Sequence, residues 1–287
     1  MNPPRLITGQ DDLVAVVRVL AAEKHVAIDT ETDSFYAYTP RVCLIQLSCN
    51  QSDFLLDPLT LRDLSPLAPL LSDPGVEKVL HASENDIIGL KRDFQLSVRP
   101  VFDTAIACRL LGRKQLALSR ILAEEFGVKS DKKLQRCNWA RRPLSHEQLS
   151  YAQQDTHFLI ELRHRLQRQL LDRDLWGAAQ ERFRRLGELR LKPKKPPHPK
   201  SYLRLPGAET LSPGSLQVLK ALFAYRERLA LRSNRAPFRV MTNEVLVRLA
   251  RERPQDLSSL LRVRGLPRWF GGGSARKLLR LLKGKGA

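Results

Sequence analysis

Two acidic residues, Asp29 and Glu31, interrupt a run over 26–32 (Val-Ala-Ile-Asp-Thr-Glu-Thr) that otherwise has the composition of a buried β-strand. Because side chains alternate along a strand, both carboxylates project from the same face. Like charges this close repel each other unless water covers that face or a cation lies between them. The pair therefore predicts either an exposed strand face, the commoner case for so short a motif, or a metal site.

Two further acids could complete a metal site. Asp86 stands at the start of a helix that we expect over 84–94, and Asp155 lies on a second expected helix. Mg²⁺ and Mn²⁺ favour such oxygen ligands, keep bound water and bridge to phosphate oxygens. Two of these ions roughly 4 Å apart can activate a water and stabilise the leaving oxygen during attack on a phosphodiester. The four acids are therefore candidate metal ligands.

The helix that carries Asp155 also carries a tyrosine. We expect one long amphipathic helix from Ser145 to about Arg168, because Ser145 and Gln148 form a capping-box pattern. Tyr151 precedes Asp155 by four residues, so the two side chains share a helix face. Tyr151 is a candidate to orient or help deprotonate an attacking water, and a surface tyrosine is the alternative.

The elements that must position these residues alternate between strands and helices. We expect strands over 26–32, 41–49, 53–57, 77–81 and 100–104, and helices over 61–71, 84–94, 105–111 and 118–126. The first three strands should open the sheet as a meander. The alternation that follows them is typical of an α/β layer architecture.

The last third of the chain is strongly basic. The whole sequence has a net charge of +19, and residues 191–287 hold 22 Lys and Arg against five Asp and Glu, or +17 of that total. Positive charge concentrated in one module points to a polyanion such as nucleic acid, with an affinity that falls steeply as salt rises. An ordinary solvated charged surface is the alternative.

A Pro- and Lys-rich run over 192–200 cannot hold a helix. It predicts an extended linker over 191–208 between a first domain, 1–190, and a second, 209–287. A basic run of this kind could also serve as a nuclear address.

The second domain should be small and all-helical. We expect its helices to begin after Ser212 and after Thr242-Asn243, with two more over 257–263 and 275–282.

The remaining composition excludes several classes of protein. The four cysteines lack the spacing of a zinc site or a disulfide framework, and no run approaches 18 uninterrupted apolar residues. Residues 1–12 have neither the apolar nor the Arg-rich pattern of a targeting segment. We therefore expect a soluble, cytoplasmic protein that does not enter a membrane, and a monomer, because no heptad pattern is present.

Three motifs in order resemble a known family, the DEDD 3′-5′ exonucleases with a tyrosine in the third motif, and within it the ribonuclease D type. The motifs are Ile28-Asp29-Thr30-Glu31-Thr32, His81-Ala-Ser-Glu-Asn-Asp86 and Tyr151-Ala-Gln-Gln-Asp155. The approach to the third motif, 131–145, is also similar. The C-terminal module resembles the helicase-and-RNase-D C-terminal (HRDC) domain around 219–229 and 237–249, so the resemblance covers nearly the whole chain.

The resemblance implies a ribonuclease H-like exonuclease domain over 1–190, with a mixed sheet flanked by helices, and a small all-α HRDC domain over 209–287. It implies a metal-dependent 3′-5′ exoribonuclease that releases nucleoside 5′-monophosphates. The implied partners are RNAs, namely tRNA precursors and other structured RNAs whose 3′ ends are trimmed.

The family's catalytic residues carry over one by one. Its acids, which hold Mg²⁺ or Mn²⁺ as two ions, fall on Asp29, Glu31, Asp86 and Asp155, and its tyrosine falls on Tyr151. Glu84 is a nearby acid, but Asp86 follows His81 by five residues, as in the family pattern. The chain departs from the pattern at Asn138 and Asn243, where relatives usually have acids, and in carrying one helical module where some relatives carry two.

Several neighbouring residues have two interpretations. We expect His81 to be packed and hydrogen-bonded rather than a metal ligand, since hard cations prefer oxygen. We expect Trp139 to pack, with base stacking as the alternative. The candidate phosphate contacts, by charge alone, are Lys132, Lys133, Arg141 and Arg142.

Two other functions compete with the exoribonuclease. A DNA 3′-5′ exonuclease would use the same acids, although no polymerase domain accompanies them here. A catalytically silent RNA-binding scaffold is the other alternative, although it has no chemical reason to keep two repelling acids on one strand.

Overall fold

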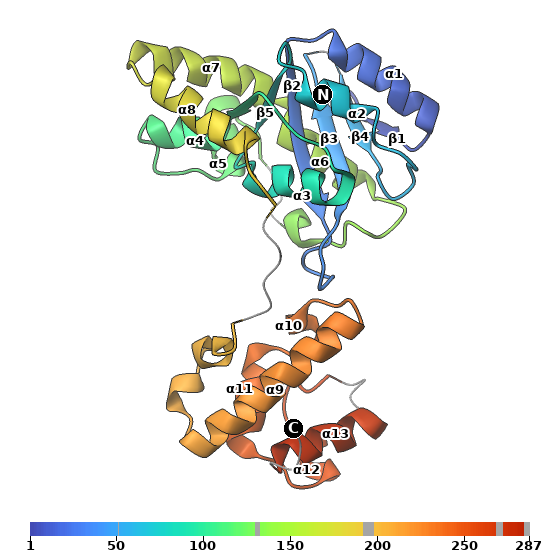
Figure 1. The fold of residues 1–287 in the computed structure, drawn as a ribbon, viewed down its shortest axis with the longest axis vertical. Coiled ribbons are helices and arrows are strands. Elements are labelled where there is room, and N and C mark those ends of the chain that lie inside the picture. The colour runs from blue at the N-terminus through green and yellow to red at the C-terminus, as the bar shows by residue number, and fades with distance from the viewer. Residues whose placement is uncertain (51, 130–132, 192–197, 268–271, 284–287) are drawn as a thin grey trace. The chain divides into compact units, whose positions relative to one another are not determined.

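The structure is a computed structural model. It describes residues 1–287 apart from Gln51, 130–132, 192–197, 268–271 and 284–287, so Lys132 and part of the expected linker lie outside the described residues. The chain forms two compact units (Figure 1): unit 1 is Met1–Asp33 with Arg41–Lys192, and unit 2 is Ser34–Pro40 with Pro193–Ala287.

A six-stranded mixed sheet forms the centre of unit 1. Its strands are β1 (Arg5–Ile7), β2 (His25–Thr32), β3 (Val42–Ser48), β4 (Asp53–Leu56), β5 (Glu77–Leu80) and β6 (Val101–Asp103). The order is β1-β4-β3-β2-β5-β6, with β2, β3 and β4 antiparallel and the remaining pairs parallel. The expected meander and the mixed sheet are both confirmed.

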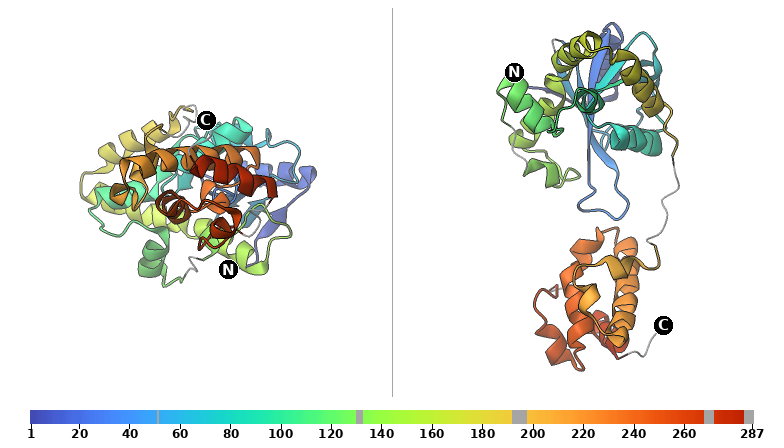
Figure 2. Two further views of the ribbon diagram at one scale, coloured as in Figure 1. Left: turned by 90° about the horizontal axis from the view of Figure 1, so that it is seen from below. Right: turned by 90° about the vertical axis from the view of Figure 1, so that its left-hand side faces the viewer.

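Helices cover both faces of this sheet (Figures 1 and 2). They are α1 (Gln10–Ala21), α2 (Leu67–Ser72), α3 (Glu84–Phe94), α4 (Thr104–Leu110), α5 (Leu118–Phe126), α6 (His146–His157), α7 (Leu159–Asp172) and α8 (Trp176–Gly187), with a 3-10 turn at Leu134–Arg136. Val26 and Ile28 of β2 pack in one core cluster with α1, α2 and α3. Ala27 packs on the opposite face with α4, α7 and α8. Strand β2 is thus enclosed on both sides before it reaches Asp29.

The prediction of a single long helix after Ser145 is wrong, because this segment forms two helices. The Ser145–Gln148 capping box is present, but α6 ends at His157 and α7 begins at Leu159. His157 Nδ1 contacts Asp53 Oδ2 of β4 at 2.8 Å, and the Phe158 ring packs against Phe126 of α5, 5.1 Å between centroids. These two long-range contacts hold the adjacent residues His157 and Phe158 at the break between the two helices.

The helix expected over 61–71 is also too long, because α2 begins only at Leu67. Aspartate side chains hold the preceding residues in turns: Asp57 Oδ1 accepts from the Leu59 amide at 3.0 Å, and Asp63 Oδ1 accepts from the Ser65 amide at 2.8 Å. Such side-chain and turn hydrogen bonds compete with helix formation. Strand β1 and helices α1 and α8 were not predicted from the sequence.

Unit 2 is all-helical in its described part, as expected. Its helices are α9 (Pro213–Arg232), α10 (Pro237–Val240), α11 (Asn243–Glu252), α12 (Leu257–Leu261) and α13 (Gly272–Leu282), with 3-10 turns at Ser201–Arg204 and Ala208–Thr210. The expected caps form, since the Ser212 and Thr242 hydroxyls accept from the amides of Ser215 and Val245. Among the described helices, none is long and apolar enough to cross a membrane.

Candidate active site

Three of the predicted acids lie together in unit 1. Asp29, Glu31 and Asp155 each offer one carboxylate oxygen, and these oxygens lie within 4.8 Å of one another. Strand β2 presents the first two on one face, and α6, which packs on β2, β3 and β4, brings Asp155 to them. All three side chains are half-buried, so the alternative of an exposed strand face is wrong.

The arrangement is electrostatically costly without a cation. Burial and the neighbouring carboxylates raise the pKa of Asp29 and of Glu31 well above their usual range. Burial raises the pKa of Asp155 to about 7, with Asp86 adding to the rise. A divalent cation among the oxygens would replace the protons that these acids otherwise hold. Hard oxygen donors of this kind fit Mg²⁺ or Mn²⁺.

The fourth acid, Asp86, is held beside this group through the strand. Thr30 Oγ1 donates to Asp86 Oδ1 at 2.5 Å, and burial raises the pKa of Asp86 to about 6. Glu84 is exposed on the same helix, which favours Asp86 as the functional acid. Thr30 was not predicted as a site residue, although its place between two candidate ligands was a signal.

Tyr151 is buried, so a surface position for it is wrong. The Asp155 carboxylate lies close enough to its hydroxyl for the two groups to shift each other's pKa, and its ring lies 6.1 Å from that of Trp139, centroid to centroid. Burial, Asp155 and Glu31 together raise the Tyr151 pKa, so the phenol keeps its proton at neutral pH. Trp139 is fully buried, which agrees with packing rather than base stacking.

His81 is packed, as expected. Its Nδ1 lies 2.8 Å from Thr104 Oγ1 and its Nε2 lies 2.9 Å from the Leu116 carbonyl oxygen. Both ring nitrogens therefore have protein partners.

The prediction of Arg142 as a phosphate contact is wrong. Its guanidinium binds the buried Asp57 carboxylate through two bonds, Nε to Oδ2 at 2.5 Å and Nη2 to Oδ1 at 2.8 Å, and donates to the Cys43 carbonyl at 2.7 Å. These bonds fasten the segment before α6 to the sheet. Lys133 and Arg141 are exposed and stay candidates.

Asn138 and Asn243, the two positions where the chain departs from the family pattern, both accept hydrogen bonds within the protein. Asn138 Oδ1 accepts from the Ala140 amide at 3.1 Å, and Asn243 Oδ1 accepts from the buried Arg226 at 2.7 Å.

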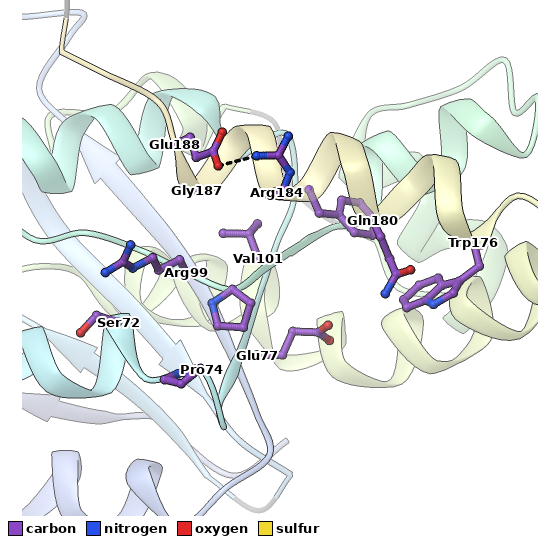
Figure 3. A pocket seen from close by; sticks show the side chains of 12 residues that line it. Ser72, Pro74, Glu77, Arg99, Val101, Trp176, Gln180, Arg184, Gly187 and Glu188 are labelled. Atoms are coloured by element: carbon purple, nitrogen blue, oxygen red, sulfur yellow. Dashed lines mark hydrogen bonds and ion pairs between the residues drawn. The ribbon is translucent and has the colours of Figure 1, made fainter.

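A cavity of about 550 Å³ lies elsewhere in unit 1, between α8 and the first residues of β5 and β6 (Figure 3). Phe183 and Val101 form part of its apolar lining, and an Arg184–Glu188 ion pair borders it. The cavity is at the N-terminal ends of these strands, whereas Asp86 follows the C-terminal end of β5. None of the five predicted site residues lines it.

Comparison with known proteins identifies the class of protein to which this fold belongs. A family model described as 3′-5′ exonuclease matches residues 4–171, and a model of the HRDC domain matches residues 215–282. In solved structures, the catalytic core of RRP6 from Trypanosoma brucei has a TM-score of 0.88 and 30% identity, covering 99% of this chain and 79% of that one. The fold is therefore that of a 3′-5′ exonuclease joined to an HRDC domain.

Ribonuclease D proteins match over most of the chain. Ribonuclease D of Haemophilus influenzae is 32% identical over 263 residues, or 91% of this chain. The structure of Escherichia coli RNase D, described as an exoribonuclease involved in structured RNA processing, has a TM-score of 0.69 and 28% identity, covering 99% of this chain and 75% of that one. The chain belongs to the ribonuclease D family. It spans 66% of the Haemophilus protein and 30% of the longer mammalian relatives that it also matches.

Proposed function

We propose that this protein is a divalent-metal-dependent 3′-5′ exoribonuclease that hydrolyses RNA from the 3′ end and releases nucleoside 5′-monophosphates. The observation that carries the proposal is the group of half-buried acids, Asp29, Glu31 and Asp155, whose oxygens lie within 4.8 Å of one another. Membership of the ribonuclease D family supports the same reaction.

Four side chains would hold the metal: Asp29, Glu31, Asp86 and Asp155. Two divalent cations held by these side chains would lower the pKa of a bound water and place positive charge at the leaving oxygen. Strand β2 and α6 fix the ligands, and the Thr30 hydroxyl fixes the orientation of Asp86. Ligands that are already positioned lose little entropy when the cation and the RNA 3′ end bind.

Tyr151 is proposed to orient the attacking water. The Tyr151 ring is held by packing against the buried Trp139, and its hydroxyl has the Asp155 and Gln135 side chains as neighbours. Because its pKa is raised, the hydroxyl acts as a hydrogen-bond donor at neutral pH and not as a base by itself. Of the two roles expected from the sequence, orienting the water therefore has better physical support than deprotonating it.

The substrates we propose are tRNA precursors and other structured RNAs with single-stranded 3′ ends, on which the protein would act as a cytoplasmic monomer. The basic second domain, 209–287, would bind RNA phosphates independently of sequence, joined to the exonuclease domain, 1–190, by the linker 191–208. The description of the Escherichia coli relative as an enzyme of structured RNA processing supports this choice.

The test is incubation of the full chain with a 5′-labelled single-stranded RNA and the same sequence as DNA, in Mg²⁺, Mn²⁺ or EDTA. We expect a ladder that shortens from the 3′ end of the RNA, with release of 5′-monophosphates, only when a divalent metal is present. Equal loss of the DNA would favour the broader nuclease. Tight RNA binding without a ladder in either metal would favour the silent scaffold and contradict the proposal.

A further inference from the structure

Gln46 of β3 faces the candidate metal site from the neighbouring strand. The β2–β3 register places Gln46 directly opposite Asp29, and the β3–β4 register places it opposite Leu55. Directly opposed residues of antiparallel strands project from the same face, with Cβ atoms about 5 Å apart. The Gln46 side chain therefore lies on the same face of the sheet as the Asp29 carboxylate, within reach of it.

The surroundings of Gln46 are closed by α6. Two residues along β3 in one direction, the Ser48 hydroxyl contacts that of Thr156 on α6 at 2.6 Å. Two residues in the other direction, Leu44 packs in a cluster with Tyr151 and Ala152 of α6. The Gln46 amide is thus enclosed between Asp29 and the helix that carries Asp155.

Gln46 is a polar side chain in a fully buried position. Its exposed fraction is 0%, and neither Nε2 nor Oε1 has a hydrogen-bond partner among the described residues. A buried amide without a partner is destabilising, and an apolar residue of similar size would avoid that cost. The polar amide of Gln46 therefore adds nothing to the stability of the fold. This points to a role toward the neighbouring Asp29 carboxylate.

We propose that Gln46 is a positioning residue for Asp29: its Nε2 donates a hydrogen bond to one buried water, which donates in turn to the ionised Asp29 carboxylate and so fixes that ligand for the divalent cation. The proposal rests on the proposed metal-dependent function. Carboxylates that bind metals are commonly held by such hydrogen bonds, and losing one weakens metal binding about 10- to 100-fold. The Thr30 backbone also forms a hydrogen bond with the Asp29 carboxylate, and the Gln46 amide would hold that carboxylate from the neighbouring strand.

The test compares Gln46→Met, which keeps the size of the side chain but removes the amide, with the wild-type full chain. We expect the Mn²⁺ dissociation constant of metal-free protein, measured by titration calorimetry, to rise about tenfold. The metal-free unfolding temperature should stay equal or increase, because an unpartnered buried amide has been removed. At saturating Mn²⁺, kcat should fall while KM for RNA is unchanged.

Ser48→Ala is the matched control, since Ser48 is buried on the same strand and face but bonds Thr156 instead of facing a candidate ligand. It should lower the unfolding temperature and leave Mn²⁺ affinity unchanged. Mn²⁺ affinity of Gln46→Met within twofold of the wild type, or a loss no larger than that of Ser48→Ala, overturns the proposal. If Gln46→Met does not fold, Gln46→Asn, which withdraws the amide by one methylene, is judged by the same Mn²⁺ criterion.

Asp155→Asn in the same titration separates this proposal from the proposed function. If the wild type binds no Mn²⁺, or Asp155→Asn binds it equally well, the metal-dependent function fails. If the wild type binds and Asp155→Asn does not, an unchanged Gln46→Met contradicts the role of Gln46 alone.

Discussion

The Thr30 hydroxyl donates to the Asp86 carboxylate at 2.5 Å and so connects the central strand β2 to the first turn of α3. Thr30 lies between Asp29 and Glu31, and its side chain projects from the opposite face of the strand. One strand therefore supplies two candidate ligands on one face and positions a third from the other.

Replacing Thr30 by Val should weaken Mn²⁺ binding and lower kcat about tenfold, because Asp86 loses the donor that fixes its orientation. The measurement is Mn²⁺ titration together with RNA turnover. Thr32→Val, two residues later on the same strand, is the matched control and should change neither. Equal Mn²⁺ affinity in Thr30→Val and the wild type would contradict the positioning role.

Replacing Asp155 by Asn should reduce RNA hydrolysis at least about a hundredfold while RNA binding changes little. The change removes one charged ligand but keeps the size of the side chain. Single-turnover cleavage and filter binding on the same RNA separate the two effects. Unchanged turnover would eliminate the proposed site.

Ending the chain after Leu191 should weaken RNA binding and flatten its salt dependence, since +17 of the +19 net charge lies beyond residue 190. RNA dissociation constants of the two chains, measured between 50 and 300 mM salt, give the two slopes. Thermal unfolding of the shortened chain checks that the first domain still folds. Equal affinity at every salt concentration would remove the role given to the basic domain.

Arg142→Met should lower the free energy of unfolding by about 3 kcal/mol, because it leaves the buried Asp57 carboxylate without its cation. RNA affinity of the folded variant should be unchanged. Arg141→Met, one residue earlier and exposed, should have no effect on stability. Urea unfolding measures the first effect and RNA titration the second; a stable Arg142→Met that binds RNA more weakly would restore the phosphate-contact interpretation.

The buried Lys78 should make the unfolding free energy of the protein depend on pH. This lysine is fully buried, its Nζ donates to the Asp73 carbonyl at 2.8 Å and the Val76 carbonyl at 2.5 Å, and burial lowers its pKa to about 8. Between that pH and the usual lysine pKa of about 10.4, the unfolded chain binds a proton that the folded chain does not. The contribution of Lys78 to the unfolding free energy therefore rises as the pH increases from the folded pKa to the unfolded pKa.

The check is urea unfolding of the wild type and Lys78→Met at pH 8 and pH 10. We expect the difference in unfolding free energy between the two proteins to shift in favour of the wild type at the higher pH. A difference that is constant with pH would mean that Lys78 stays charged in the folded protein.

Local interactions made parts of this structure predictable from the sequence. Helix α3 has the predicted bounds, and the caps at Ser145, Ser212 and Thr242 form as expected, because a cap joins residues three positions apart. The same holds for the placement of Asp29 and Glu31 on one face, which follows from the alternation of side chains along any strand.

Contacts between distant segments decided the rest. The break between α6 and α7 depends on Asp53 and Phe126, and the structural role of Arg142 depends on Asp57, 85 residues away. No local pattern encodes these partners, since they meet only when α6 packs on the sheet.

The sequence by itself determined the types of residue available for the chemistry and the elements that carry them: acids on a strand and two helices, and a basic domain after a Pro-rich run. Only the tertiary structure decided that three acids converge, that Asp86 joins them through Thr30, and that Gln46 stands opposite Asp29. The physical reason is that strand register and helix packing are set by burial of the whole core, so the positions of side chains far apart in the sequence are fixed together.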